Sequence, residues 1–136
     1  MAIKGTIEDR EEVRVLHACY CLSIDTGRYE EWIGCFTEDG VFESPRFGKQ
    51  SGRDGLKRFT AVYRESLGGA QVLHVVANPA FDLDGATGTG TSYFLYYHCK
   101  NGVVQQSTVG YYTDKLRKTA AGWRFASRQV TILGHH

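Results

Sequence analysis

Four long stretches rich in β-branched and aromatic residues dominate the second half of the chain, and they most constrain its fold. They cover residues 71–83, 87–99, 103–117 and 123–133. Turn residues such as Asp84-Gly85 and Asn101-Gly102 separate them, and connections this short join antiparallel neighbours. The sequence therefore predicts an antiparallel meander. Strands of about 13 residues greatly exceed the usual five or six and tend to bend, so we expect strong curvature.

Three helices are predicted ahead of these strands. Residues 7–26 carry apolar side chains at helical spacing behind a capping pattern at Thr6. Residues 28–36 and 51–67 form shorter amphipathic segments, and a small strand is expected at 41–44. Helices followed by a long antiparallel sheet indicate one α+β domain over residues 1–136. We expect the helices to pack on the curved, mostly antiparallel sheet and to form a cone with an internal pocket.

Composition excludes several classes of partner. The 16 Lys and Arg residues nearly balance the 15 Asp and Glu residues, and the two signs are interspersed. Such a chain has no electrostatic footprint for nucleic acid or an anionic membrane. No apolar run approaches the roughly 20 residues of a membrane span. We therefore expect a cytoplasmic protein whose partner is a small, apolar cyclic molecule.

Cofactor motifs are not found in the sequence. The glycines of the segment 85–90 lack the spacing and the following helix of a dinucleotide-binding motif. The four cysteines show no zinc-type spacing, and we interpret them as free thiols. We therefore expect neither a metal nor an organic cofactor.

The aromatic content of the strands fits either a pocket or an ordinary core. Phe94, Tyr96, Val109 and Tyr111 alternate beside the polar His98, which is typical of a pocket wall. An aromatic core has the same pattern. Gly88, Gly90 and Gly110 lie inside the strands and mark candidate bulges that would curve the sheet.

Two titratable residues lie where stability alone does not favour them. Asp25 falls in the last turn of the first predicted helix, where the macrodipole disfavours an anion. It can also cap the turn or face water. His74 lies in the apolar strand segment 71–76, where a buried imidazole needs a partner. A carboxylate partner would fix its tautomer and create a proton-transfer pair, whereas a satisfied core histidine is the simpler alternative.

Arg128 and Tyr20 are further candidates. Arg128 lies in the last predicted strand. If its side chain points to the concave face of the sheet, it can bind an oxyanion in the pocket, and if it points to the convex face, it is solvated. Tyr20 precedes Asp25 by five positions and can donate to a substrate oxygen or pack in the core.

The chain resembles SnoaL-like proteins of the nuclear transport factor 2 (NTF2-like) superfamily over nearly its whole length. The resemblance is carried by Asp9-Arg10, Tyr20 to Asp25, Phe36 to Phe42 and the closing Gly122 to Phe125. Within the superfamily it is most similar to the scytalone dehydratase, bile acid 7α-dehydratase and hexachlorocyclohexane dehydrochlorinase group. The resemblance implies a cone-shaped fold around a deep pocket.

The resemblance also implies roles for individual residues. His74 matches the general base and Asp25 the carboxylate that orients it, while Tyr20 and Arg128 match groups that assist the reaction. His98 matches a second pocket histidine. In the dehydratases a pocket tyrosine follows the second helix, but this chain has Val41 to Ser44 there.

These observations predict a cofactor-independent lyase of the dehydratase type, or an isomerase, acting on a steroid, polyketide or terpenoid. Alternatives are a non-catalytic ligand-binding or scaffold subunit of the same fold, and a polyketide cyclase or epoxide hydrolase. Long strands with exposed apolar faces also favour self-association, so we expect a homodimer or homotrimer.

Overall fold

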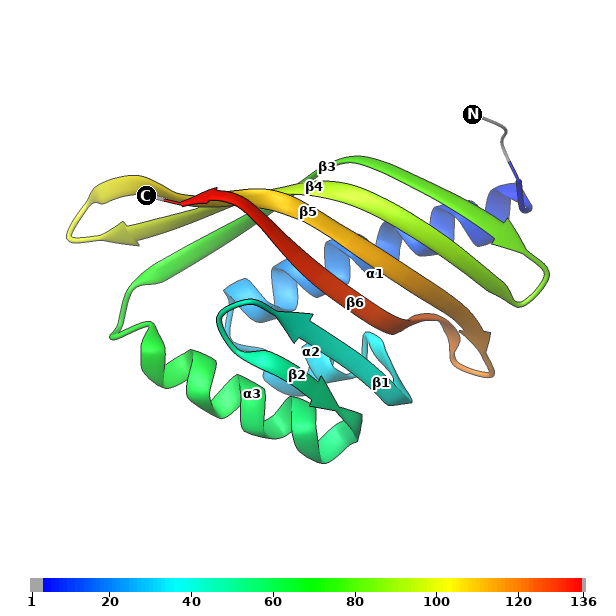
Figure 1. Ribbon diagram of the computed structural model, residues 1–136, viewed down its shortest axis with the longest axis horizontal. Coiled ribbons are helices and arrows are strands. Elements are labelled where there is room, and N and C mark those ends of the chain that lie inside the picture. Colours follow the sequence, from blue (N-terminus) through cyan, green and yellow to red (C-terminus); the bar gives the residue numbers. More distant parts are fainter. Residues whose placement is uncertain (1–3, 136) are drawn as a thin grey trace.

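A computed structural model describes residues 4–135, which form three helices and six strands (Figure 1). The elements are α1 (Ile7–Asp25), α2 (Tyr29–Ile33), β1 (Phe36–Ser44), β2 (Gly48–Ser51), α3 (Gly52–Ser66), β3 (Gln71–Asp84), β4 (Thr87–Lys100), β5 (Val103–Thr119) and β6 (Gly122–His135). In this part of the chain, no helix combines the length and the apolar character needed to cross a membrane.

All six strands belong to one sheet in the order β2-β1-β6-β5-β4-β3. β1 runs parallel to β6, and every other neighbouring pair is antiparallel. The predicted α+β architecture and the meander are confirmed. Three details differ from the sequence prediction. α2 is shorter than predicted, β1 begins earlier, at Phe36, and β2 was not predicted. β2 is a four-residue edge strand with exposed polar residues, so it lacks the apolar alternation that identifies a strand.

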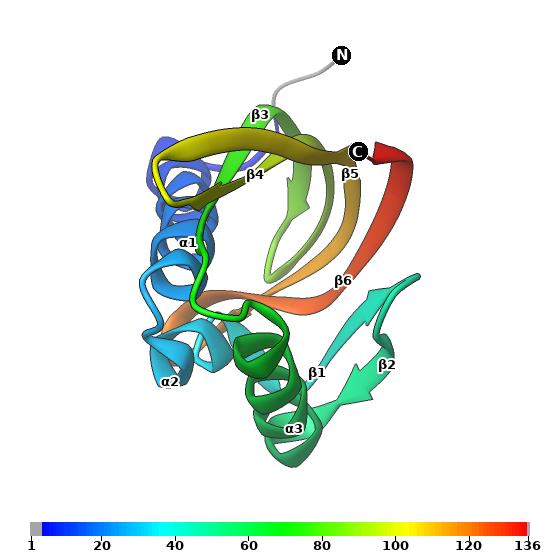
Figure 2. The ribbon, with the colours of Figure 1, turned by 90° about the vertical axis from the view of Figure 1, so that its left-hand side faces the viewer.

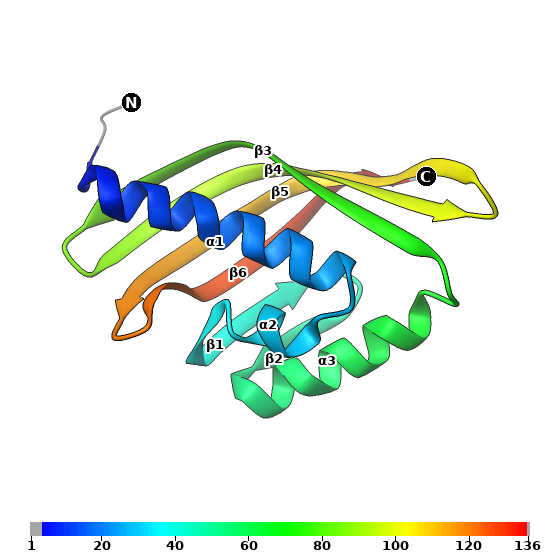
Figure 3. The same cartoon turned by 180° about the vertical axis from the view of Figure 1, so that it is seen from behind.

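The sheet curls so strongly that its strands and helices enclose a central space. Figure 2 shows β3 to β6 arching over this space, with α1 and α2 on one side and α3 below. Figure 3 shows α1 lying across the inner side of the long strands. The register shifts within the long pairs, between Ala77 and Ala80, between Tyr96 and Tyr97 and twice along β5, contribute to this curvature.

Gly110 lies at one of these shifts and illustrates how closely the strands approach. A Cβ atom there would lie 2.8 Å from Cε1 of Phe94 and would collide with the carbonyl oxygen of Thr131. Gly88 and Gly90, in contrast, pair regularly with Leu83 and Phe81, so they mark no bulge.

An aromatic core packs between the helices and the sheet. Thr6 caps α1 by accepting a hydrogen bond from the backbone N–H of Asp9 at 3.1 Å, as the sequence predicts. The inner faces of α1, α2 and α3 contribute fully buried residues such as Val13, Trp32 and Leu56. Trp123 and Phe125 of β6 pack into the same cluster, so this core anchors the helices against the sheet.

Candidate active site

A cavity of about 160 Å³ lies between the helices and the inner face of the sheet. Its wall is mostly aromatic and aliphatic, with a few polar groups that converge on it, as in small-molecule sites. The apolar wall includes Trp32, Phe42, Phe59, Phe94, Val130 and Ile132. The polar groups include Tyr20, Tyr63, His74, Tyr96 and His98. The aromatic residues therefore form both a core and a pocket wall.

Asp25 and His74 lie in contact. Oδ1 of Asp25 is 2.5 Å from Nδ1 of His74, and Oδ2 accepts a hydrogen bond from the backbone N–H of His74 at 2.8 Å. The side chains are only 7% and 13% exposed, respectively. Both carboxylate oxygens are thus occupied by one residue, which fixes the position of the imidazole ring.

The two residues approach the cavity from different sides. His74 lines the cavity, whereas Asp25 lies behind it and borders a shallow outer groove. Because Nδ1 is held by Asp25, Nε2 is the nitrogen of His74 left free. Asp25 ends α1, where the helix dipole disfavours a carboxylate, and its two hydrogen bonds to β3 compensate.

Two further candidates from the sequence, Tyr20 and His98, also line the cavity. Tyr20 is 3% exposed, and burial raises the pKa of its phenol well above the usual value. Its ring lies edge-on to His74 with 6.4 Å between the centroids. The pKa of His98 is lowered, first by burial and then by the positive charge of Arg46. Tyr20 is therefore a neutral hydrogen-bond donor at neutral pH, and His98 favours its neutral form.

Tyr96 belongs to the predicted pocket wall, but its pairing with Tyr63 was not predicted from the sequence. Their phenolic oxygens are 2.6 Å apart, and both residues line the cavity. The ring of Tyr96 packs against His74, with 4.4 Å between the centroids. Burial raises the pKa of Tyr96 to about 12 and raises that of Tyr63 as well, so both phenols keep their protons. Tyr63 occupies the apolar face of α3, where sequence periodicity indicates only core packing.

Arg128 does not line the cavity and is not solvated, so neither alternative predicted for it describes its position. It is fully buried, and its Nε and Nη2 each donate to a carboxylate oxygen of Asp114 at 2.8 Å. Nη2 also lies 3.0 Å from Nδ1 of His17. Its guanidinium stacks between Tyr20 and Tyr112, whose rings form part of the cavity wall. Arg128 thus supports the wall from behind.

The sequence prediction of which β5 residues line the cavity was wrong. Thr108 and Tyr112 line the cavity, whereas the predicted Val109 and Tyr111 do not. Side chains alternate between the two faces of a strand, so an error of one residue exchanges inner and outer positions. Gly110 pairs with Phe94, which places the even-numbered residues from Thr108 to Leu116 on the inner face.

The strand after α2 brings Phe42 and Ser44 to the cavity, and no tyrosine, as the sequence indicates. All four cysteines are free. Among residues 4–135, no group of three or more His, Cys, Asp or Glu side chains is arranged to hold a metal ion. The polar groups available to a ligand are therefore imidazoles, phenols, hydroxyls and the arginine at position 46.

Comparison with known structures identifies close relatives of this fold. A variant of Rv3472, a protein of unknown function from Mycobacterium tuberculosis, is 28% identical with a TM-score of 0.85, covering 93% of this chain and 77% of that one. An NTF2-like protein with a cystatin-like fold from Novosphingobium aromaticivorans is 26% identical with a TM-score of 0.85, covering 93% and 83%. A Catenulispora acidiphila structure in complex with S-DNPA is 26% identical with a TM-score of 0.82, covering 90% and 92%.

The family assignment rests on the sequence as well. A comparison with curated proteins finds no match. Residues 5–129 match the SnoaL-like domain family, which is nearly the whole chain. The fold of the chain is that of the NTF2-like, cystatin-like neighbours. The protein therefore belongs to the SnoaL-like domain family.

Proposed function

We propose that this protein is a cofactor-independent lyase that eliminates water from a cyclic, largely apolar ketone, with His74 as general base. The observation that carries the proposal is the contact between Asp25 and His74, with only His74 on the cavity wall. An imidazole held by a carboxylate at Nδ1 and open at Nε2 has the arrangement of a proton acceptor. The resemblance to the scytalone dehydratase group supports the same assignment.

The first step is removal of a proton from the carbon next to the substrate carbonyl. Nε2 of His74 takes this proton, and Asp25 stabilises the imidazolium that forms. The electron pair of the broken C–H bond moves into the ring system, and negative charge develops on the carbonyl oxygen. A hydrogen-bond donor near that oxygen lowers the barrier.

The Tyr63–Tyr96 pair supplies such a donor. With 2.6 Å between the oxygens, one phenol donates to the other, and the second phenolic proton remains for a ligand. A donor that is itself hydrogen-bonded is strengthened by cooperativity. Tyr96 also packs on His74, so the proton acceptor and the donor are neighbours. Tyr20 and His98 are the groups available to a leaving hydroxyl.

In the second step the hydroxyl group on the carbon next to the deprotonated one takes the proton held by His74 and leaves as water. The charge on the carbonyl oxygen collapses back, and a carbon–carbon double bond forms. Return of the proton to another carbon instead gives isomerisation, which uses the same residues. An epoxide hydrolase usually gathers acidic and amide groups around a water, and no Asp, Glu, Asn or Gln lines the described cavity.

Proton abstraction can be tested without the natural substrate. Exchange of the α-hydrogens of 2-tetralone for deuterium in D2O, followed by mass spectrometry, reports the first step alone. We expect the protein to accelerate exchange over buffer, and His74→Ala and Asp25→Asn each to lower the rate by about 100-fold or more. Tyr96→Phe should lower it by about tenfold or more through loss of the donor.

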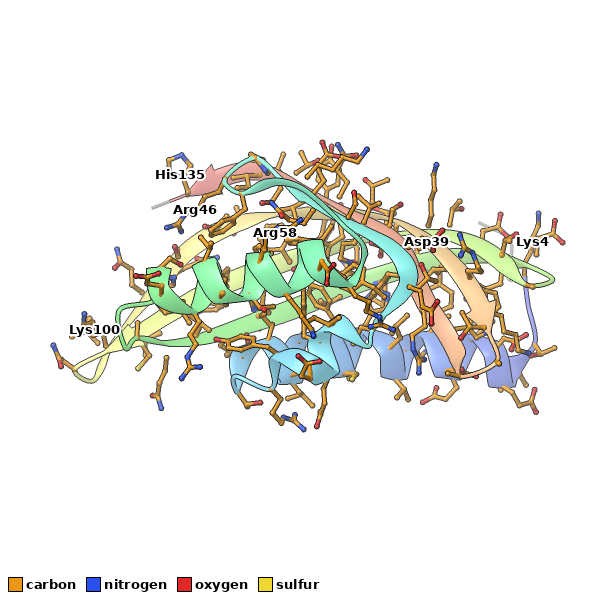
Figure 4. All side chains as sticks on the ribbon, turned by 90° about the horizontal axis from the view of Figure 1, so that it is seen from below. Lys4, Asp39, Arg46, Arg58, Lys100 and His135 are labelled. Atoms are coloured by element: carbon orange, nitrogen blue, oxygen red, sulfur yellow. The ribbon has the colours of Figure 1, made fainter. Side chains whose placement is uncertain are left out.

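Matched surface variants control for general effects. His135→Ala and Asp39→Asn change the same residue types outside the cavity and should leave exchange unchanged (Figure 4). Quenching of Trp32, which lines the cavity, reports whether 2-tetralone binds. Binding without exchange by the wild-type protein would favour the ligand-binding alternative. Exchange at the wild-type rate in His74→Ala would remove His74 from the mechanism.

The relative from Catenulispora acidiphila was solved in complex with S-DNPA, which supports ligand binding as a property of this fold.

A further inference from the structure

Arg46 is the only Lys, Arg, Asp or Glu residue among those that line the described cavity. It belongs to the three-residue turn that joins β1 to β2. Its side chain is exposed although it borders the cavity, so it lies at the mouth. Figure 4 shows it toward the end of the molecule where His135 lies. Arg46 therefore places a guanidinium at the rim of the cavity.

The turn holds Arg46 in place. The backbone N–H of Phe47 donates to Oγ of Ser44 at 3.1 Å, and the side-chain amide of Gln50 donates to the carbonyl oxygen of Phe47 at 2.9 Å. The guanidinium carbon of Arg46 lies 5.1 Å from the ring centroid of Phe47, which is itself part of the cavity wall. Stacking on an aromatic ring orients the guanidinium and keeps it at the rim.

The charge of Arg46 has no partner within the part of the chain that the structure describes. None of the ion pairs or side-chain hydrogen bonds of residues 4–135 involves its guanidinium. Asp25, behind the wall, uses both oxygens on His74. The charge of Arg46 also acts inside the cavity, because it lowers the pKa of His98 and partly offsets the raised pKa of Tyr96.

We propose that Arg46 binds a carboxylate carried by the substrate, which makes the substrate a cyclic ketone with an acidic side chain. This inference rests on the proposed function for the identity of the reacting group. The planar fork of a guanidinium matches the two oxygens of a carboxylate. The ring system enters the aromatic cavity beside His74, and the carboxylate stays at the mouth, where it keeps part of its hydration. The proposal adds one charged group to the small, apolar cyclic ligand that the sequence predicts.

A pair of isosteric probes isolates the contribution of the charge. 2-Naphthoate is an anion at pH 7.5, and 2-naphthamide has the same shape without charge. Their dissociation constants are measured by quenching of Trp32 fluorescence or by calorimetry. We expect the wild-type protein to prefer 2-naphthoate by about fivefold, the range of a partly exposed ion pair. Raising the salt concentration to 0.5 M should reduce this preference, since ions screen charges at the surface.

Variants then assign the preference to one residue. Arg46→Gln should abolish the preference and leave the affinity for 2-naphthamide within about twofold, whereas Arg46→Lys should retain part of it. Arg58→Gln is the matched control, because Arg58 is also exposed, lies on α3 and does not line the cavity (Figure 4). An equal preference in wild type and Arg46→Gln, or no preference in wild type, would overturn the proposal.

The test of the carboxylate site does not depend on whether the protein is an enzyme. These measurements record binding only, so loss of the carboxylate preference leaves the exchange reaction of His74 intact. Conversely, a protein that prefers 2-naphthoate but fails to exchange the hydrogens of bound 2-tetralone contradicts the proposed function and leaves the carboxylate site standing.

Discussion

Replacing His17 with glutamine isolates the contribution of one buried imidazole to the pH dependence of stability. His17 is 7% exposed, and its Nδ1 lies 3.0 Å from Nη2 of Arg128, from which it accepts a hydrogen bond. Burial, followed by the positive charges of Arg128 and Arg14, lowers the pKa of His17 to about 3. The folded protein therefore keeps this imidazole neutral well into the acid range.

The sign and size of the effect follow from linkage. In the unfolded chain a histidine has a pKa of about 6.5, so below that pH the unfolded state binds a proton that the folded state does not. Stability is complete above pH 6.5 and falls with decreasing pH toward the folded pKa. The difference at pH 5 amounts to about 2 kcal/mol relative to pH 8, and any folded pKa below about 4 gives the same figure.

Urea denaturation at pH 8 and pH 5 measures this loss directly. Glutamine can accept the hydrogen bond from Arg128 but does not titrate, so His17→Gln should lose about 2 kcal/mol less stability on acidification than the wild type. The remaining titratable groups are common to both proteins and cancel in the comparison. Equal losses in the two proteins would mean that His17 is protonated in the folded state and would refute the reasoning.

Two further predictions concern the structure behind the cavity. Asp114→Asn leaves the buried charge of Arg128 without its partner and should lower the free energy of unfolding by about 3–5 kcal/mol. The control Asp39→Asn breaks only an exposed ion pair and should lower it little. Gly110→Ala introduces a Cβ 2.8 Å from the ring of Phe94 and should destabilise the protein by about 1–3 kcal/mol. Chemical denaturation measures both, and a stability equal to that of the wild type would contradict either one.

The sequence predicted the parts of the site that depend on long, regular elements. Asp25 lies at the end of a 19-residue helix, and its unfavourable position in the helix dipole marked it as a candidate. His74 was recognisable because an imidazole inside an aliphatic strand needs a partner. Their contact joins residues 49 positions apart, and only the resemblance to a family with this pairing pointed to it.

The missed features depend on register and on neighbours distant in sequence. Arg128 pairs directly with Asp114 across β5 and β6, and no pattern within a single strand specifies that partner. Tyr63 meets Tyr96 from a helix on the far side of the cavity, 33 residues away. The inner face of β5 depends on the register shift opposite Tyr96 and Tyr97 of β4, which alternation alone does not locate.

Two arginines show how the surroundings decide the role of a residue type in this fold. Arg128 points inward from β6, but Asp114 neutralises its charge and the rings of Tyr20 and Tyr112 cover it at 4.4 and 3.9 Å. Although Nη1 of Arg128 has no hydrogen-bond partner among the described residues, the ion pair with Asp114 and the two covering rings separate this charge from a ligand in the cavity. Arg46 rests on a single ring and has no acidic partner among the described residues, so its charge is available at the mouth. Of the two arginines, Arg46 is therefore the cation that can meet the carboxylate of a substrate.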